Sequence, residues 1–259
     1  LLPDDHPQVP PPGSAEQERM IALIEGVYAG DFERSLDVFL DVPFSEVNDC
    51  CVDTASALLG LGRGDAGPPR VLDLGAGIGT TAARFVRSHG SAAEVRVHDL
   101  SPRLLERARQ QLGDEFSGVP IDTVTLDLLC ESLSARLGPQ SHDVVLASNV
   151  LHLLPRERQA EVIADVYELL SEGGVFASVL HLKILAPAWK TRIRQQLRAW
   201  WLEAGLEPEA FEQRVVPHFE RQHTHTTLPA FFGALQRAGF RLYDCPYRRF
   251  IYGVVVAVK

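Results

Sequence analysis

The sequence predicts an α/β fold built around a mostly parallel β-sheet. An apolar strand runs into a glycine-rich turn and a helix at residues 71–80, and two later strands each end in an acidic residue. Further apolar strands alternate with amphipathic segments of helical period. Helical connections between parallel strands bring the carboxyl ends of those strands to one edge of the sheet. We therefore expect a ligand site at that edge.

The first strand and its turn read Val71-Leu72-Asp73-Leu74-Gly75-Ala76-Gly77-Ile78-Gly79-Thr80. Glycines permit positive φ and let a ligand approach the backbone, and the helix that follows begins with free N–H groups. A dinucleotide-binding turn would place a third glycine at Thr80 and has no use for the acid Asp73. The motif predicts a nucleotide cofactor across the turn, and a turn that serves only packing is the alternative.

Two more acids follow predicted strands. Asp99 ends the strand at 94–100 and lies 20 residues after Gly79, where an acid can accept both ribose hydroxyls of an adenosine. The strand at 121–126 leads into Asp127. Each acid alone is typical of a solvated loop, but three acids at the ends of parallel strands indicate a binding crevice. Between them, Ser101 and Pro102 predict the start of a helix.

Together these motifs resemble those of class I S-adenosylmethionine-dependent methyltransferases. The resemblance implies that Asp73 lies under the amino-acid moiety of the cofactor, that Asp99 binds its ribose and that Asp127 lies near its adenine amino group. It also implies a Rossmann-like sheet of seven strands, mostly parallel, with an antiparallel seventh strand. The remaining cofactor contacts that it implies are Gly75, Ala76, Gly77, Gly79, Leu100, Leu128 and Asn149.

The segment after the fourth strand, 143–148, carries the candidate for catalysis. Asn149 follows this strand, and the resemblance places it beside the sulfonium. His152 stands where plant-type small-molecule O-methyltransferases carry a general-base histidine, although Leu153 and Leu154 depart from their Leu-His-Asp-Trp pattern. A general base, a pocket wall and a core residue all remain open for His152. His181, late in the strand 175–182, is expected beside the acceptor.

The rest of the chain is assigned by its flanking elements. Residues 1–68 are expected to form a proline-rich linker and a helical cap, with helices at 15–28 and 45–61. Residues 69–182 form the cofactor-binding core, 183–228 a helical lid and 229–259 the completion of the core. The last stretches are a helix at 228–237 that stops at Gly239, and strands at 240–245 and 250–258 joined by the link 246–249. A helix from Pro155 is expected to stop at Gly173-Gly174.

The lid supplies the predicted substrate residues, which are Trp189, Arg214 and His218. Its histidines, His218, His223 and His225, also allow a metal site, because imidazole binds iron and zinc. No carboxylate stands at a spacing that would complete such a site, so the sequence favours a polar, substrate-facing loop without metal. The adjacent Cys50 and Cys51 are interpreted as small apolar residues of a helix rather than as a thiol site.

Composition limits the partners. The chain of 259 residues has 46% hydrophobic residues and a formal net charge of −9. This acidic balance disfavours nucleic acid, whose phosphates need a basic face. There is no apolar run long enough for a membrane span and no visible signal peptide. These features, with only four cysteines, predict a cytoplasmic enzyme with a small or carrier-protein-tethered substrate and an undetermined oligomeric state.

Three functions remain from the sequence. The first is methyl transfer from S-adenosylmethionine to an O, N or C nucleophile of a metabolite in biosynthesis, including the case of a methyltransferase domain cut from a megasynthase. The second is a repurposed enzyme of the same fold, either metal-dependent or cofactor-modifying. The layout indeed also resembles carboxy-S-adenosylmethionine synthases, in which a lid arginine holds the added carboxylate, and Arg214 is the nearest candidate here. The third is a non-catalytic binding domain.

Overall fold

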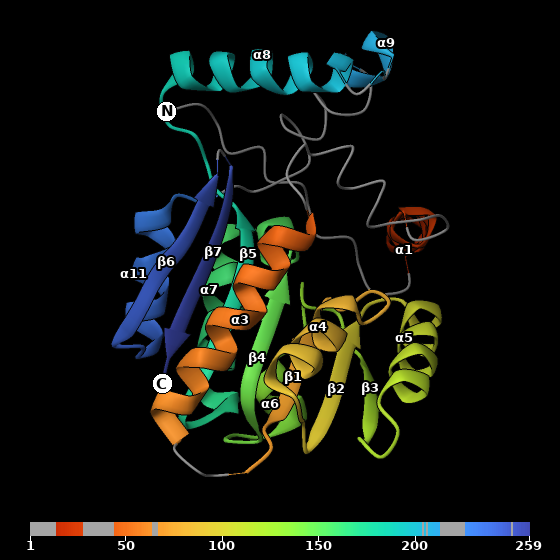
Figure 1. Cartoon of the computed structure of the whole chain (residues 1–259), viewed down its shortest axis with the longest axis vertical. Coiled ribbons are helices and arrows are strands. Elements are labelled where there is room, and N and C mark those ends of the chain that lie inside the picture. The colour runs from red at the N-terminus through yellow and green to blue at the C-terminus, as the bar shows by residue number, and fades with distance from the viewer. Residues whose placement is uncertain are drawn as a thin grey trace.

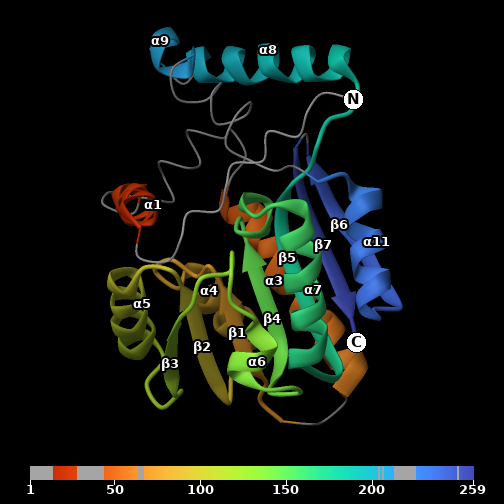
Figure 2. The ribbon, with the colours of Figure 1, turned by 180° about the vertical axis from the view of Figure 1, so that it is seen from behind.

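A computed structural model of the chain describes residues 14–27, 44–63, 67–203, 205, 207–212, 226–249 and 251–259. These residues contain one seven-stranded sheet with helices on both faces (Figures 1 and 2). The strands are β1 (Arg70–Leu74), β2 (Glu94–Asp99), β3 (Ile121–Thr125), β4 (His142–Ser148), β5 (Leu170–His181), β6 (Leu242–Arg249) and β7 (Tyr252–Val258). The helices are α1 (Ala15–Val27), α3 (Phe44–Arg63), α4 (Thr80–His89), α5 (Pro102–Glu115), α6 (Leu133–Leu137), the 3-10 turn η1 (Leu151–Leu153), α7 (Arg156–Leu169), α8 (Pro187–Glu203), α9 (Pro208–Ala210) and α11 (Leu228–Ala238).

The strand order is β3-β2-β1-β4-β5-β7-β6. Strands β1 to β5 pair in parallel, and β7 is antiparallel to both β5 and β6. The predicted α/β sheet with its antiparallel seventh strand is confirmed, and β7 lies one place in from the edge. The strand order reverses between β1 and β4. In open α/β sheets, ligands bind at such a reversal, outside the carboxyl ends of the strands.

Each face of the sheet buries its own apolar core, because successive strand residues point to opposite faces. Val71 and Val144 pack with α3, α4 and α5, whereas Leu72 and Val145 pack with α6, α7 and α11. The polar residues at the ends of β1, β4 and β5 lie an even number of positions from Val71, Val144 and Val175, so they point to the same face as these residues. Asp73, Ser148 and His181 thus belong to the face that α3 and α4 cover.

Several helix ends follow the predicted signals. The Ser101 hydroxyl accepts a hydrogen bond from the Leu104 N–H at 3.2 Å, and Pro102 takes the first helical position of α5. Helix α11 ends at Gly239, whose φ of 118° is left-handed. These capping signals were sufficient because both depend on residues close in sequence.

Two boundaries were predicted wrongly. Helix α7 ends at Leu169 rather than at the glycine pair, and β5 begins at Leu170, which pairs with His142 across a register shift. The expected link 246–249 is instead part of β6, whose register with β7 shifts between Asp244 and Tyr247. In both cases an irregular strand continues through residues that usually mark a turn.

The two N-terminal helices differ in role. Helix α3 lies along the sheet and buries Cys51, Val52 and Ala55 in the core, so it is more than a cap. Helix α1 lies beyond the carboxyl ends of β2 and β3, and α8 lies beyond those of β4 and β5 (Figures 1 and 2). The predicted Tyr28 end of the first helix and the proline-rich linker lie outside the described residues.

Candidate functional site

The glycine-rich turn between β1 and α4 has the backbone that its sequence predicts. Gly75, Gly77 and Gly79 have φ values of 62°, 56° and 83°, in the left-handed region that favours glycine. A Cβ on Gly75 would lie 2.6 Å from Val150 Cγ2. The Ala76 N–H donates to the His98 carbonyl at 2.8 Å, which ties the turn to β2. The turn is therefore both conformationally and sterically restricted to glycine at Gly75.

Asp73 is fully buried at the end of β1. Its Oδ2 accepts a hydrogen bond from the Ala82 N–H at 3.0 Å, so the side chain holds the first turn of α4. Burial raises the pKa of Asp73 to about 7, and the nearby Asp99 carboxylate acts in the same direction, while the bond from Ala82 opposes both. The charge of this carboxyl group therefore responds to pH near neutrality.

Asp99 connects the glycine-rich turn to the start of α5. Its Oδ2 accepts from the Gly77 N–H at 2.9 Å and its Oδ1 accepts from the Ser101 N–H at 2.9 Å. A carboxylate offers about four acceptor positions. Two of them remain for a ligand, and Leu100 lies partly exposed beside them. The predicted acid therefore lies at the carboxyl end of its strand.

His98 belongs to this turn, although the sequence analysis did not select it. The Gly75 N–H donates to its Nδ1 at 3.2 Å, so Nε2 carries the proton and donates to the Leu126 carbonyl at 2.9 Å. Burial lowers its pKa and favours this neutral form. The histidine connects β1, β2 and β3. Its sequence signal is weak, because Glu94, Arg96 and His98 alternate with the valines of β2 and the alternation alone predicts a solvent-facing side chain.

Asp127 lies in the loop after β3, in contact with α1. Its Oδ2 accepts from Gln17 Nε2 at 2.6 Å and its Oδ1 accepts from the Leu129 N–H at 2.9 Å. Leu128 beside it is buried in the core with α6 and α7. Glu25 of α1 also accepts from the Ser101 hydroxyl at 2.6 Å. The position of Asp127 was predictable from sequence, whereas these two contacts from the N-terminal helix were not.

Asn149 begins the second half of the site, after β4. It has a left-handed φ of 57°, and its N–H donates to the Val179 carbonyl at 3.0 Å. Its Oδ1 is buried and has no hydrogen-bond partner among the described residues. Such an atom costs about 1 to 3 kcal/mol unless a ligand supplies a donor. Next to it, the Ser148 hydroxyl donates to Asn48 of α3 at 2.7 Å.

His152 and His181 come together although 29 positions separate them in the sequence. Their rings stack with centroids 3.9 Å apart and planes 13° apart, and both side chains are buried. Tyr252 of β7 meets His181 edge to face, at 4.8 Å between centroids. Burial raises the pKa of the Tyr252 hydroxyl well above its ordinary value, so it stays protonated. The two predicted catalytic residues thus form one aromatic cluster with Tyr252.

The predicted substrate residues of the lid are described only in part. Trp189 is 66% exposed, whereas Ile193, Leu197 and Trp201 of the same helix are buried. The apolar face that α8 buries therefore includes Trp201 and leaves out Trp189. Arg214 and His218 lie outside the described residues, as do His223 and His225.

The described residues contain neither a metal-binding cluster nor a membrane-spanning helix. No group of three or more His, Cys, Asp or Glu side chains in this part of the chain is arranged to hold a metal ion. None of its helices is long and apolar enough to cross a membrane. The four cysteines are free thiols, with Cys51 buried and Cys50 partly buried in α3, as their interpretation as apolar residues predicts.

Comparisons with known proteins agree with this geometry. The family model of a methyltransferase domain matches residues 71–174. A carboxy-S-adenosyl-L-methionine synthase of Chromohalobacter salexigens is 32% identical over 199 residues, which are 73% of this chain and 68% of that protein. A highly reducing polyketide synthase of Penicillium soppii is 29% identical over 152 residues, which are 55% of this chain but 6% of the synthase. The structure of a magnesium protoporphyrin IX methyltransferase from Synechocystis, with bound S-adenosylhomocysteine, has a TM-score of 0.58 at 19% identity and covers 94% of this chain and 93% of that one.

The fold and these similarities define an enzyme that uses S-adenosylmethionine as its cofactor. The chain belongs to the family of S-adenosylmethionine-dependent methyltransferases. The polar groups of the site fit this cofactor. The carboxylates of Asp99 and Asp127, at the ends of neighbouring strands, can each accept a further hydrogen bond. The buried Oδ1 of Asn149 needs a hydrogen-bond donor such as an ammonium group.

Proposed function

We propose that this enzyme transfers a methyl group from S-adenosylmethionine to an O, N or C nucleophile of a small or carrier-tethered metabolite. The observation that carries the proposal is the position of the His152–His181 pair. The pair lies at the carboxyl ends of β4 and β5, and β4 is the neighbour of β1, which carries Asp73. Asp99 and Asp127 follow at the same edge, at the ends of β2 and β3. A nucleotide site and a pair of buried imidazoles therefore share one edge of the sheet.

In this proposal the cofactor lies across the ends of β1, β2 and β3. Asp99 binds the ribose hydroxyls, Asp127 and Leu128 surround the adenine, and Asp73 and Asn149 bind the amino-acid moiety. Gly75, Ala76, Gly77 and Gly79 allow close approach of the backbone, and Leu100 packs beside the ribose. S-adenosylmethionine supplies an activated methyl group on a sulfonium when it is bound.

His152 acts as the general base. An imidazole accepts a proton near neutral pH, and a base that removes the proton of a hydroxyl acceptor strengthens it as a nucleophile. His181 stacks on His152 and fixes its ring plane. The protein must also hold the acceptor atom about 3 to 3.5 Å from the methyl carbon and exclude water. Residues 183–228 serve this purpose as a lid, with Trp189, Arg214 and His218 as substrate contacts.

The similarity to a segment of a polyketide synthase supports a carrier-tethered acceptor as one substrate type. The net charge of −9 argues against nucleic acid as the acceptor. Either type of substrate, a free metabolite or one attached to a carrier, must place its nucleophile beside His152.

A second candidate function is formation of carboxy-S-adenosylmethionine. It is favoured by the 32% identity to a synthase of that product over most of both chains. The two candidates share the cofactor site and differ in what reaches the sulfonium. In carboxy-S-adenosylmethionine formation, the space beside His152 and His181 would hold a compound that donates a carboxylate, rather than a metabolite that receives a methyl group.

The decisive experiment identifies the small molecules that copurify with the protein. The protein is denatured, and the released molecules are analysed by mass spectrometry. S-adenosylmethionine or S-adenosylhomocysteine is the expected result. A carboxylated sulfonium overturns methyl transfer in favour of the second candidate. A radiolabelled methyl group is then followed into a panel of phenols, amines and carrier-bound β-ketoacyl groups, with S-adenosylhomocysteine release as the common readout.

A further inference from the structure

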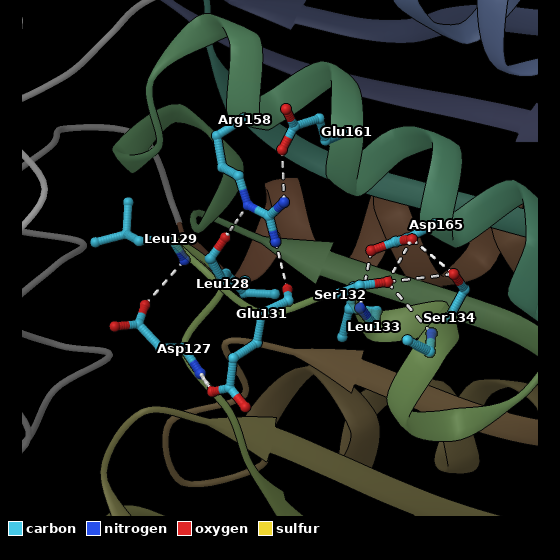
Figure 3. A network of polar contacts seen from close by, with 11 residues as sticks. Asp127, Leu128, Leu129, Glu131, Ser132, Leu133, Ser134, Arg158, Glu161 and Asp165 are labelled. Atoms are coloured by element: carbon cyan, nitrogen blue, oxygen red, sulfur yellow. Dashed lines mark hydrogen bonds and ion pairs between the residues drawn. The ribbon is translucent and has the colours of Figure 1, made fainter. Parts of the chain in front are cut away.

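Arg158 contacts the loop that carries Asp127, although it belongs to a different helix. Figure 3 shows Arg158 in the first turn of α7, extended toward the loop between β3 and α6. Its Nε donates to the Leu128 carbonyl at 2.5 Å, and its Nη2 donates to the Glu131 carbonyl. The third arm of the guanidinium, Nη1, binds Glu161 at 2.6 Å. One side chain therefore fixes both ends of residues 128–131.

The loop is also bonded internally in a way that depends on this shape. The Asp127 N–H donates to Glu131 Oε2 at 2.8 Å, and the Glu131 N–H donates to the Asp127 carbonyl at 2.9 Å. The Leu129 N–H donates to Asp127 Oδ1. The bond from Leu129 thus ties one oxygen of the Asp127 carboxylate to residues 128–131, which Arg158 holds at both ends, while Gln17 of α1 binds the other oxygen.

We propose that Arg158 is a positioning residue for the adenine end of the cofactor site. This inference rests on the proposed function, in which Asp127 accepts from the adenine amino group. The planar guanidinium presents several N–H donors in a fixed geometry, so it can bind two carbonyls and a carboxylate at once. A lysine carries all its donors on one nitrogen, so it does not reproduce the planar fork that holds both carbonyls and Glu161 in a fixed arrangement. The guanidinium preorganises the loop, which reduces the ordering cost of binding.

The same network offers a matched control. Asp165, two turns further along α7, accepts from the Leu133 N–H at 2.8 Å and from the Ser132 and Ser134 hydroxyls at 3.0 and 2.7 Å (Figure 3). It connects α7 to the start of α6 without touching residues 127–131 in any of these bonds. Loss of the Asp165 contacts therefore tests the structural connection between α7 and α6 without removing the Arg158 contacts.

The test compares two probes, S-adenosylhomocysteine and S-inosylhomocysteine, in which oxygen replaces the adenine amino group. Calorimetry measures both affinities for the wild type, Arg158→Lys, Arg158→Gln and Asp165→Asn, and thermal unfolding checks that each variant folds. We expect the wild type to bind the adenine compound about tenfold more tightly, since a lost hydrogen bond to a charged group is worth about 1.5 kcal/mol. Arg158→Gln should reduce this ratio to about twofold, Arg158→Lys should give an intermediate ratio, and Asp165→Asn should retain the wild-type ratio.

A ratio that stays at the wild-type value in both Arg158 variants overturns the inference. Equal affinity of the wild type for the two probes also overturns it, because Asp127 would then not recognise the adenine amino group and Arg158 could not affect that recognition. Failure of the cofactor assignment has a different signature, which is a wild type that binds neither probe. Failure of methyl transfer alone is shown by a carboxylated sulfonium among the copurifying molecules and leaves the affinity ratios as expected. If Arg158→Gln does not fold, Arg158→Lys against Asp165→Asn still decides between a positioning role and a purely structural one.

Discussion

At the cofactor end of the site, Asp73, Asp99 and Asp127 each accept a hydrogen bond from a backbone N–H. At the acceptor end, His152 and His181 meet ring to ring, and Asn149 keeps a buried oxygen with no partner among the described residues. Directional hydrogen bonds to the backbone fix the position of a carboxylate closely, whereas stacking constrains the plane of a ring. In the proposed function, the first end therefore serves to position the cofactor, and the second end carries the imidazoles that take part in the chemistry.

The largest effect is expected from removing the proposed base. His152→Ala should lower kcat by about 10²- to 10⁴-fold, because proton transfer from the acceptor loses its partner. Cofactor affinity should change little, since the residue lies at the other end of the site. Steady-state kinetics with calorimetry of S-adenosylhomocysteine binding measures both quantities. A loss of less than tenfold in kcat would leave His152 as a wall of the pocket.

The next prediction tests whether the glycine-rich turn tolerates a side chain at Gly75. Gly75→Ala is compared with Gly90→Ala, because both glycines have positive φ, of 62° and 84°, but only Gly75 has a neighbour in the way. The left-handed conformation costs either variant about 1 to 2 kcal/mol. The overlap with Val150 should cost Gly75→Ala about 1 to 3 kcal/mol more. Urea unfolding measures the two free energies, and equal losses would show that the turn adapts.

Asp99→Ala should have a smaller effect, confined to binding and to the local turn. Cofactor affinity should fall by about 1 to 3 kcal/mol, because a charged acceptor is lost. Asp99→Asn, which keeps one side-chain oxygen, should lose less. The exposed Asp122, one strand away and paired with Arg96, provides a control by substitution with alanine. Calorimetry that finds unchanged affinity in Asp99→Ala would require a new position for the ribose.

The strand ends were predictable from sequence because each is marked locally. A short strand with alternating or continuous apolar residues, followed by an acid or a glycine, identifies the carboxyl ends of β1, β2 and β3. The Ser101 and Gly239 caps lie within a few residues of what they bind. Asp73, Asp99 and Asp127 were therefore found with their correct positions on the sheet. Their roles toward the cofactor remain predictions.

The contacts between distant segments were not predictable in the same way. Gln17 meets Asp127 across 110 positions, and nothing in the helical pattern of α1 distinguishes this glutamine from a solvated one. His98 has the pattern of a half-buried strand residue until the position of β3 is known. The stacking of His152 on His181 depends on the register of β4 with β5, which begins with an irregular pair at Leu170. Each of these features follows from tertiary packing.

A further prediction concerns the charge of Asp73, whose effect is confined to the dependence of stability on pH, and its sign follows from the direction of the pKa shift. Burial raises the pKa of the folded carboxyl to about 7, whereas an unfolded aspartate ionises near pH ~3.9. Between these values the folded state binds more protons, so the contribution of Asp73 to stability falls as pH rises. Asp73→Asn should remove this fall. The free energy of unfolding of the variant, relative to that of the wild type, should therefore rise by at most about 1.4 kcal/mol per pH unit.

His142 supplies a control of opposite sign. Burial lowers its pKa to about 4, so its contribution to stability rises with pH up to the ordinary pKa of histidine. Over that range, the free energy of unfolding of His142→Asn should fall relative to that of the wild type. Urea unfolding from pH ~4 to ~7 measures both differences, and a difference between Asp73→Asn and the wild type that does not change with pH would contradict the assignment. Saturation with S-adenosylhomocysteine should reduce the Asp73 slope, because the ammonium group of the ligand favours an ionised carboxylate. A slope that the ligand leaves unchanged would place Asp73 outside the cofactor site and leave it with the structural role of holding α4.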